Sequence, residues 1–140
     1  MLAKLKNKKL SKKGFTLAEL LAVVAIIAVL VAIAIPVFTS ATKKAEEAVE
    51  VANARAVYGE GMVAVVSGDD ITGGLKRTYG EKVFTFTYTP ESTTGGVTTN
   101  ASWEITIEMA SGKTGKVYNS TITGTDNSTS AFDNIKIDGE

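Results

Sequence analysis

The sequence predicts an α+β fold in which one long N-terminal α-helix packs on a small antiparallel β-sheet. Hydrophobic residues first run without interruption and then recur every three or four positions, as far as about residue 67. Beyond that point the period of the hydrophobic pattern falls to two, which is typical of strands joined by short turns. The chain of 140 residues has room for one small domain besides this helix.

The first half of the predicted helix is a continuous apolar segment. Residues 15–35, as an α-helix, would extend roughly 31 Å, which is close to the hydrocarbon thickness of a bilayer. A conventional cleaved signal has a shorter core, although Ala32 and Ala34 could mimic a signal-peptidase site and keep that alternative open. Pro36 lacks an amide donor, so we expect it to kink or locally open the helix without ending it.

The second half of the helix is predicted to be amphipathic. Its apolar face consists of Ala45, Val49, Ala52, Ala56, Gly59, Val63 and Val66. Its other face consists of Lys43, Lys44, Glu46, Glu47, Glu50 and Arg55. We expect the apolar face to pack on the sheet and the charged face to meet solvent.

Two segments alternate regularly between apolar and polar residues and predict half-buried strands. The apolar positions are Phe84, Phe86 and Tyr88, followed later by Trp103, Ile105, Ile107 and Met109. Their alternation is what a sheet packed on a helix requires, so we interpret these aromatics as core rather than as a ligand groove. A hairpin loop at 111–115 is expected to lead to a strand that includes Tyr118, Ser120 and Ile122, and a last short strand to include Ile135 and Ile137. Residues 91–100 and 124–130 are small and polar, and are expected to form exposed loops.

Charge is balanced overall but unevenly placed along the chain. The chain has 15 basic and 15 acidic residues, and six lysines precede Gly14. Removal of these six would leave 15 − 6 = 9 basic residues against 15 acidic ones, a formal charge of −6. An acidic body argues against a general electrostatic hold on nucleic acid. Lysines beside an apolar segment favour the cytoplasmic side of a membrane, so the N-terminus should stay inside.

The chain contains neither cysteine nor histidine. Disulfides and thiolate metal sites are therefore excluded, and so are the commonest general base and the commonest metal ligand. We expect no enzymatic activity, no cofactor and no metal site.

One short motif carries most of the functional information. The segment Lys12-Lys13-Gly14-Phe15-Thr16-Leu17-Ala18-Glu19, followed by the apolar run and Pro36, closely resembles the leader junction of type IV prepilins and pseudopilins. The resemblance covers about residues 8–38 and is most like a cysteine-free type IV major pilin. It implies that a membrane-embedded prepilin peptidase cuts between Gly14 and Phe15 and methylates the new amino terminus. A glycine leaves the backbone sterically open at the cut, and the leader charges Lys8, Lys9, Lys12 and Lys13 set the orientation.

Glu19 is a solitary carboxylate within the membrane segment, and it costs about 2.5–3.5 kcal/mol there on insertion scales. The resemblance suggests that it pairs with the freed amino group of Phe15 on a neighbouring subunit during assembly. The alternative is a residue near enough to the interface to stay hydrated. Pro36 lies where the resemblance suggests that the helix loosens in a filament, and its alternative role is a simple kink.

The resemblance implies three parts: a cleaved leader at 1–14, a transmembrane and filament-core helix at 15–38, and a globular head at 39–140. The precursor would be a single-pass protein of the inner membrane. It would assemble with its own copies into a surface filament for adhesion, motility or DNA uptake, with the pilus assembly platform and its ATPase as partners. The missing carboxy-terminal disulfide puts in doubt any receptor-binding loop.

Two alternative functions remain open at this stage. One is a pseudopilin of a secretion or competence system, which shares the leader junction. The other is a singly anchored binding protein whose helix never leaves the membrane.

Weaker signals have ordinary explanations. Three triplets beginning at Asn100, Asn119 and Asn127 match the glycosylation acceptor pattern, which a surface rich in serine and threonine produces easily. Asp126, Asp133 and Asp138 could suggest calcium, but their spacing fits no EF-hand loop, so we interpret them as solvated turn residues.

Overall fold

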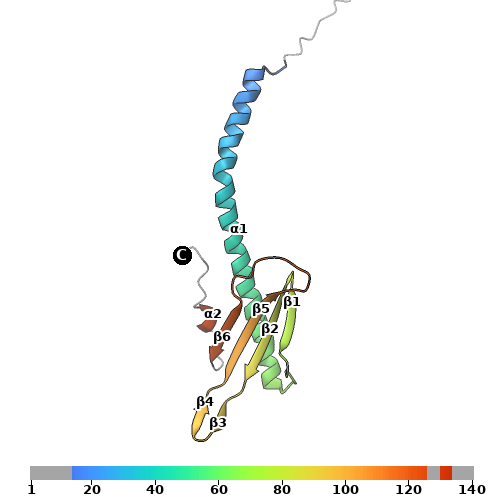
Figure 1. Ribbon diagram of the computed structural model, residues 1–140, viewed down its shortest axis with the longest axis vertical. Coiled ribbons are helices and arrows are strands. Elements are labelled where there is room, and N and C mark those ends of the chain that lie inside the picture. The colour runs from blue at the N-terminus through green and yellow to red at the C-terminus, as the bar shows by residue number, and fades with distance from the viewer. Residues whose placement is uncertain (1–13, 126–129, 134–140) are drawn as a thin grey trace, which may run out of the picture. The chain divides into compact units, whose positions relative to one another are not determined.

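The computed structural model describes residues 14–125 and 130–133, and its architecture is the predicted α+β fold (Figure 1). Helix α1 spans Leu17–Ser67, and the short helix α2 spans Ser130–Asp133. The strands are β1 (Leu75–Tyr79), β2 (Lys82–Thr89), β3 (Ser92–Thr94), β4 (Val97–Thr99), β5 (Ser102–Met109) and β6 (Thr121–Thr125). The chain divides into two compact units after Ser40, and the second half of α1 belongs to the unit that contains the sheet.

The main sheet is an antiparallel meander with the strand order β1-β2-β5-β6. Strand β1 and the ribbon of β3 and β4 were not predicted, and the expectation of a loop over residues 91–100 is wrong. The ribbon keeps the register of the β2–β5 hairpin, because Thr89 lies opposite Ser102 and Thr94 lies opposite Val97. Pro90 cannot donate a ladder hydrogen bond, which accounts for the gap between β2 and β3. Every residue of the ribbon is exposed, as predicted for this segment.

The ribbon closes with Gly95 and Gly96, which have φ values of 64° and 82°. Two central residues with positive φ are what a two-residue type I′ hairpin turn needs. Residues 82–109 are therefore one long hairpin, whose outer part extends beyond the sheet (Figure 1).

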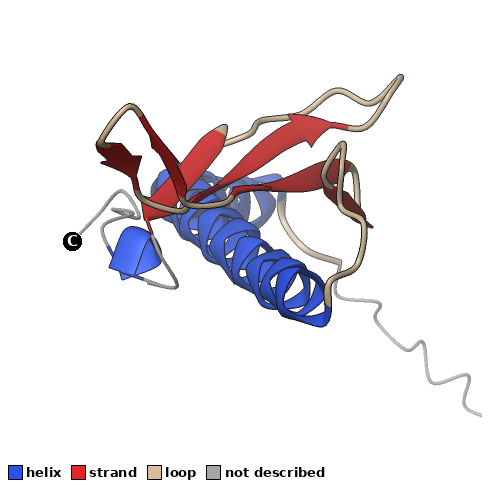
Figure 2. Ribbon diagram, turned by 90° about the horizontal axis from the view of Figure 1, so that it is seen from below, coloured by secondary structure: helices blue, strands red, loops and turns tan. Residues whose placement is uncertain are grey.

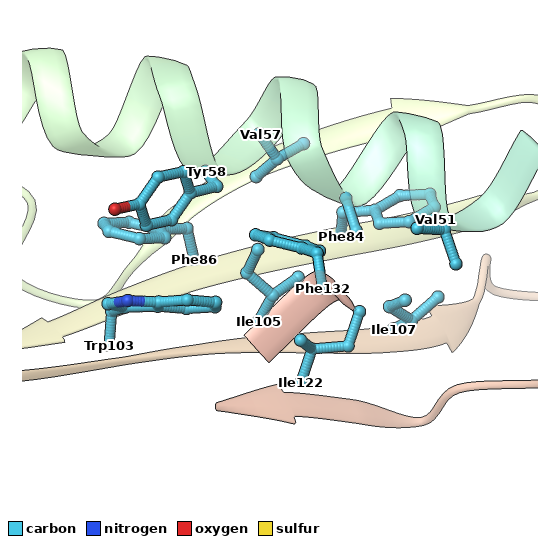
Figure 3. Packing of buried hydrophobic residues seen from close by; sticks show 11 residues of the cluster. Val51, Val57, Tyr58, Phe84, Phe86, Trp103, Ile105, Ile107, Ile122 and Phe132 are labelled. Carbon is cyan, nitrogen blue, oxygen red and sulfur yellow. The ribbon is translucent and has the colours of Figure 1, made fainter. Parts of the chain in front are cut away.

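The core lies between the sheet and the second half of α1, which covers one face of the sheet (Figure 2). The predicted alternation is confirmed: Phe84, Phe86, Trp103, Ile105 and Ile107 are buried and face the helix (Figure 3). They pack against helix residues that include Val51, Ala54, Val57 and Tyr58. Aromatic rings contribute strongly, since the centroids of Tyr58 and Trp103 are 4.6 Å apart and Phe132 of α2 stacks on Trp103 at 5.3 Å.

The prediction of the helix face that packs on the sheet is wrong. All seven residues of the predicted apolar face are exposed, and Val49, Val63 and Val66 keep 59%, 65% and 82% of their surface accessible. The face that packs on the sheet consists of Glu47, Glu50, Val51, Ala54, Val57, Tyr58 and Gly61. This face carries the larger side chain of Tyr58, and it also allows close approach, because a Cβ on Gly61 would lie 2.2 Å from the Phe86 ring.

The C-terminal third differs from the prediction in one further respect. The strand expected around Tyr118 begins only at Thr121, because the backbone amides of Tyr118 and Asn119 bond to a side chain of α1 instead of a strand. The predicted strand at Ile135 and Ile137 lies outside the described residues, as do Asp126, Asp138 and the triplet that begins at Asn127. Asp133 is exposed and pairs with Arg55 at 3.3 Å.

Candidate functional site at the start of helix α1

The candidate processing junction is exposed and precedes the first turn of α1. Gly14, Phe15 and Thr16 are all accessible, and Phe15 keeps 88% of its surface. A Cβ at Gly14 would meet no atom within 4 Å, and this glycine does not have a positive φ. The fold therefore imposes no requirement for glycine at position 14. The leader lysines Lys8, Lys9, Lys12 and Lys13 lie outside the described residues.

Thr16 and Glu19 form a reciprocal cap on the first turn of α1. The backbone amide of Thr16 donates to Glu19 Oε2 at 2.8 Å, and the amide of Glu19 donates to Thr16 Oγ1 at 3.2 Å. The Thr16 hydroxyl also donates to Glu19 Oε2, at 2.9 Å. This arrangement is a capping box, in which two residues three positions apart satisfy each other's free amides. The Glu19 carboxylate also lies where the helix dipole favours a negative charge.

This cap was not predicted, although its Thr-x-x-Glu signature stands at the start of an apolar run. The cap has a consequence for the expected pairing of Glu19 with the Phe15 amino group. The carboxylate is held beside the Thr16 amide, and the nitrogen of Phe15 is only one residue earlier in the chain. Glu19 is thus fixed near the atom that cleavage would convert into an amine, and Pro36, 17 positions further on, is not part of this cluster.

In the apolar first half of α1, none of the residues is buried among the described part of the chain. The helix is long and apolar enough to cross a membrane, and its most apolar window has a mean hydropathy of 3.2 with none of its residues buried. Its large side chains are exposed, from Val31 at 47% to Leu17 at 79%. Such a surface needs either lipid or other protein around it.

Helix α1 continues through Pro36, as expected. Proline cannot donate the usual amide bond at this position. One turn on, the hydroxyl of Thr39 donates to the backbone carbonyl of Ile35 at 2.9 Å. Such back-bonding by threonine is common in helices and often accompanies local bending.

A second polar cluster lies on the sheet-facing side of α1, around the buried Glu50. Its carboxylate accepts hydrogen bonds from the backbone amides of Tyr118, at 3.2 Å, and Asn119, at 2.6 Å. It also forms an ion pair with the ammonium group of Lys82. The side chain of Glu50 is 1% exposed and that of Lys82 is 19% exposed. These contacts attach the connection between β5 and β6 to the helix. The expectation that Glu50 and Glu47 face solvent is therefore wrong.

Tyr118 extends the cluster towards solvent. Its hydroxyl donates to Glu46 Oε2 at 2.9 Å. This bond raises the pKa of Tyr118, with further contributions from partial burial and from the negative charges of Glu46 and Glu47. The ammonium groups of Lys82 and Lys116 lie 5.2 Å and 5.0 Å from the centroid of the tyrosine ring. The cluster joins elements that are far apart in sequence, and we interpret it as structural.

Comparison with known protein families gives a match on the junction and the apolar segment. Residues 9–35 match a family model described as the prokaryotic N-terminal methylation motif. The match supports the type IV prepilin and pseudopilin family that the junction resembles, and it leaves the head unmatched. None of the curated proteins or solved structures compared with the chain matches it.

Proposed function

We propose that this chain is the precursor of a type IV pilus subunit, which is cut between Gly14 and Phe15 and polymerises through its N-terminal helix into a surface filament. The observation that carries the proposal is the methylation motif at residues 9–35, which covers an accessible junction and an apolar helical segment that is exposed among the described residues. Structural subunits of this kind need no catalytic residues of their own.

The processing step is a hydrolysis by prepilin peptidase. Water adds to the carbonyl carbon of Gly14, the bond to the Phe15 nitrogen breaks, and the leader leaves with a new carboxylate. A methyl donor then supplies one methyl group to the Phe15 amine, which keeps its basic character. The open backbone at Gly14 supports this step, because no side chain shields the bond.

After cleavage, Glu19 acquires a cationic partner. In the apolar interior of a filament, an unmatched carboxylate or ammonium is costly, so pairing of Glu19 with the Phe15 amine of a neighbouring subunit would set axial register. The capping box supports this role, since it orients the carboxylate before assembly.

The proposed processing and assembly also define the location and the partners of the chain. Before assembly the precursor would lie in the inner membrane with residues 1–14 inside, and the filament would form by addition of identical subunits at the assembly platform, driven by its ATPase. The formal charge of −6 after loss of the leader argues against a general electrostatic hold on nucleic acid.

N-terminal sequencing and intact-mass measurement of material sheared from producing cells test the proposal. We expect fibres whose subunits begin with a methylated Phe15. Gly14→Val is expected to block cleavage and fibre formation, while Gly59→Val, also at an exposed glycine without a positive φ, leaves cleavage unchanged. Fibres built from chains that still carry residues 1–14 would contradict the proposal.

A pseudopilin is the second candidate, because the methylation motif belongs to prokaryotic precursors of both kinds. Deletion of the chain distinguishes the two. Lost surface fibres support the pilus subunit, whereas lost protein secretion or transformation without any change in fibres supports the pseudopilin.

A further inference from the structure

The ribbon formed by β3 and β4 projects from the sheet, and among the described strands it pairs with no other (Figure 1). On one side of the long hairpin β1 reaches only as far as Phe86, and on the other side β6 reaches only as far as Ser102. All residues of both ribbon strands are exposed. A two-stranded ribbon without a buried face is marginally stable in water, so this ribbon would gain from an additional strand.

The register of the ribbon shows which backbone groups lie on its edges. Thr94 and Val97 flank the two-residue turn, and such a pair exchanges hydrogen bonds between the strands. The next pair, Thr93 and Thr98, is therefore one whose amides and carbonyls point away from the partner strand. The two hydroxyls lie 3.1 Å apart, in keeping with the closer side chains of such a pair. Thr98 thus presents an amide donor and a carbonyl acceptor on the outer edge of β4, and Thr93 does so on the outer edge of β3.

The outer edge of β4 lacks the features that usually protect an edge strand, which are charged side chains and proline. Residues 92–103, 12 in all, are uncharged and form the longest such stretch within residues 39–140. The edge of β3 differs, because Pro90 and Glu91 directly precede it. The threonines and the valine of β4 favour extended structure, and Val97 keeps 69% of its surface exposed. The β4 edge is therefore open to a further strand, whereas the β3 edge is protected at its start.

We propose that the outer edge of β4 binds the same edge of a second copy, with the two strands antiparallel and Thr98 opposite Thr98. Each Thr98 would donate its amide to the carbonyl of the other copy, and Val97 of each copy would lie opposite Thr99 of the other. Two ribbons joined in this way form one four-stranded sheet, which supplies the additional strands that each ribbon lacks.

Charge favours a second copy as the occupant. After loss of the leader each copy has a formal charge of −6, so two copies repel each other over much of their surface. In a two-fold contact every residue meets itself or a near neighbour, so a charge close to the axis would face a like charge. Residues 96–100 contain no charged residue, and this edge can therefore meet its own copy without that cost.

The symmetry of the contact places it between two filaments, and in this respect the inference rests on the proposed filament function. Subunits of one filament repeat through head-to-tail contacts between two different surfaces, whereas a two-fold contact closes on itself. The β4 edge would therefore join a head of one filament to a head of another. A contact made by three-residue strands is weak alone, but two filaments with the same repeat offer many such contacts at once.

Electron microscopy and low-speed sedimentation of sheared fibres test the inference. We expect unmodified fibres to associate side by side and Thr98→Pro fibres to be dispersed. The substitution removes the amide on the outer edge of β4 but no hydrogen bond within the ribbon, because that amide points outward. Thr93→Pro is the matched control, since it makes the same change in the same cross-strand pair at the other edge. Its fibres should associate as the unmodified fibres do.

Cross-linking gives a second measurement that does not depend on a proline variant forming fibres. Directly opposite residues of a hydrogen-bonded antiparallel pair have Cα atoms about 5.5 Å apart, which is within the range of about 4.4–6.8 Å that a disulfide allows. Oxidised Thr98→Cys fibres should therefore give covalent dimers on a non-reducing gel. No longer product is expected, because the chain has no other cysteine. Thr93→Cys fibres should remain monomeric on the same gel.

Three outcomes would overturn the inference. They are unmodified fibres that remain single, Thr98→Pro fibres that associate normally, and equal loss of association in the Thr93→Pro control. Dimers from Thr93→Cys but not from Thr98→Cys would also overturn it, because the contact would then lie on the β3 edge. Absence of fibres from the unmodified chain would instead contradict the proposed function.

Discussion

The two halves of helix α1 have opposite relations to the rest of the molecule. The first half has exposed side chains on every face, and its one acid, Glu19, bonds only to a neighbour three positions away. The second half packs on a sheet and buries two acids, one of which bonds to residues 32 to 69 positions away. An exposed helical segment can be interpreted from local sequence, whereas a packed one depends on what the rest of the chain brings to it.

The largest effect is expected at Glu19, in the first half. Glu19→Gln removes the negative charge but keeps a side chain that can complete a capping box. We therefore expect leader cleavage to continue and surface fibres to be lost, because the Phe15 amine would have no charged partner. Immunoblotting for the cleaved form and electron microscopy of sheared material measure the two outcomes separately.

Thr16→Val is the matched control for this variant. It removes the hydroxyl that accepts a hydrogen bond from the Glu19 amide, and it leaves the carboxylate in place. Loss of an N-cap costs about 1 kcal/mol of helix stability, so fibres should persist. If Glu19→Gln formed normal fibres and Thr16→Val did not, the cap rather than the charge would be the essential feature.

In the second half, the buried acid Glu50 should have the largest effect on stability. Glu50→Ala leaves Lys82 and two backbone amides without their carboxylate, and breaking such a buried pair costs about 3–5 kcal/mol. The exposed Glu46→Ala should cost about 1 kcal/mol or less. Urea unfolding of the detergent-solubilised chain, followed by fluorescence of the single Trp103, measures both variants. Equal midpoints for the two would mean that Glu50 does not fasten the connection between β5 and β6.

The same contrast explains which parts of the fold could be predicted. Phe84 and Phe86 alternate with polar residues inside one strand, so the sequence of that strand alone predicts which side is buried. The Thr16–Glu19 cap likewise has a local signature of four residues. Glu50 offers no such signal, because its partners are contributed by β2 and by a connection 68 positions away. The helical pattern alone therefore places Glu50 in solvent, whereas the folded chain surrounds it with hydrogen-bond donors.

The choice between helix faces failed for a related reason. Both faces of the second half have apolar residues at helical spacing, and the exposed face, from Ala45 to Val63, has the fewer charges. Charge alone favoured the wrong face, whereas the sheet selected the face with Tyr58 and with a glycine small enough to admit Phe86.

Two glycines sharpen this distinction because they lie two positions apart on opposite faces. A Cβ on Gly61 would lie 2.2 Å from Phe86, so Gly61→Ala should destabilise the head by about 1–3 kcal/mol through overpacking. A Cβ on Gly59 would meet nothing within 4 Å, so Gly59→Ala should stabilise the helix by up to about 1 kcal/mol. Urea midpoints measure both. Stabilisation by Gly61→Ala would place the sheet on a different face of α1.

The smallest effect is a pH dependence at the edge of the Glu50 cluster. The hydrogen bond to Glu46 raises the pKa of Tyr118 above its ordinary value of 10.0, because the bond requires the protonated hydroxyl. A pKa that is higher in the folded state contributes stability that is fully present below pH 10 and is lost as the pH rises through the folded-state pKa. We therefore expect the urea midpoint to fall above pH 10, and Tyr118→Phe to reduce that fall.

Tyr58 provides the internal comparison for this measurement. Burial raises the pKa of Tyr58 as well, so stability should still decline at high pH in the Tyr118→Phe variant, although less steeply than in the unmodified chain. The difference between the two curves isolates the contribution of Tyr118. Curves that coincide from pH 8 to 11 would mean that the bond to Glu46 forms equally well in the unfolded chain, and that the polar cluster is held by Glu50 alone.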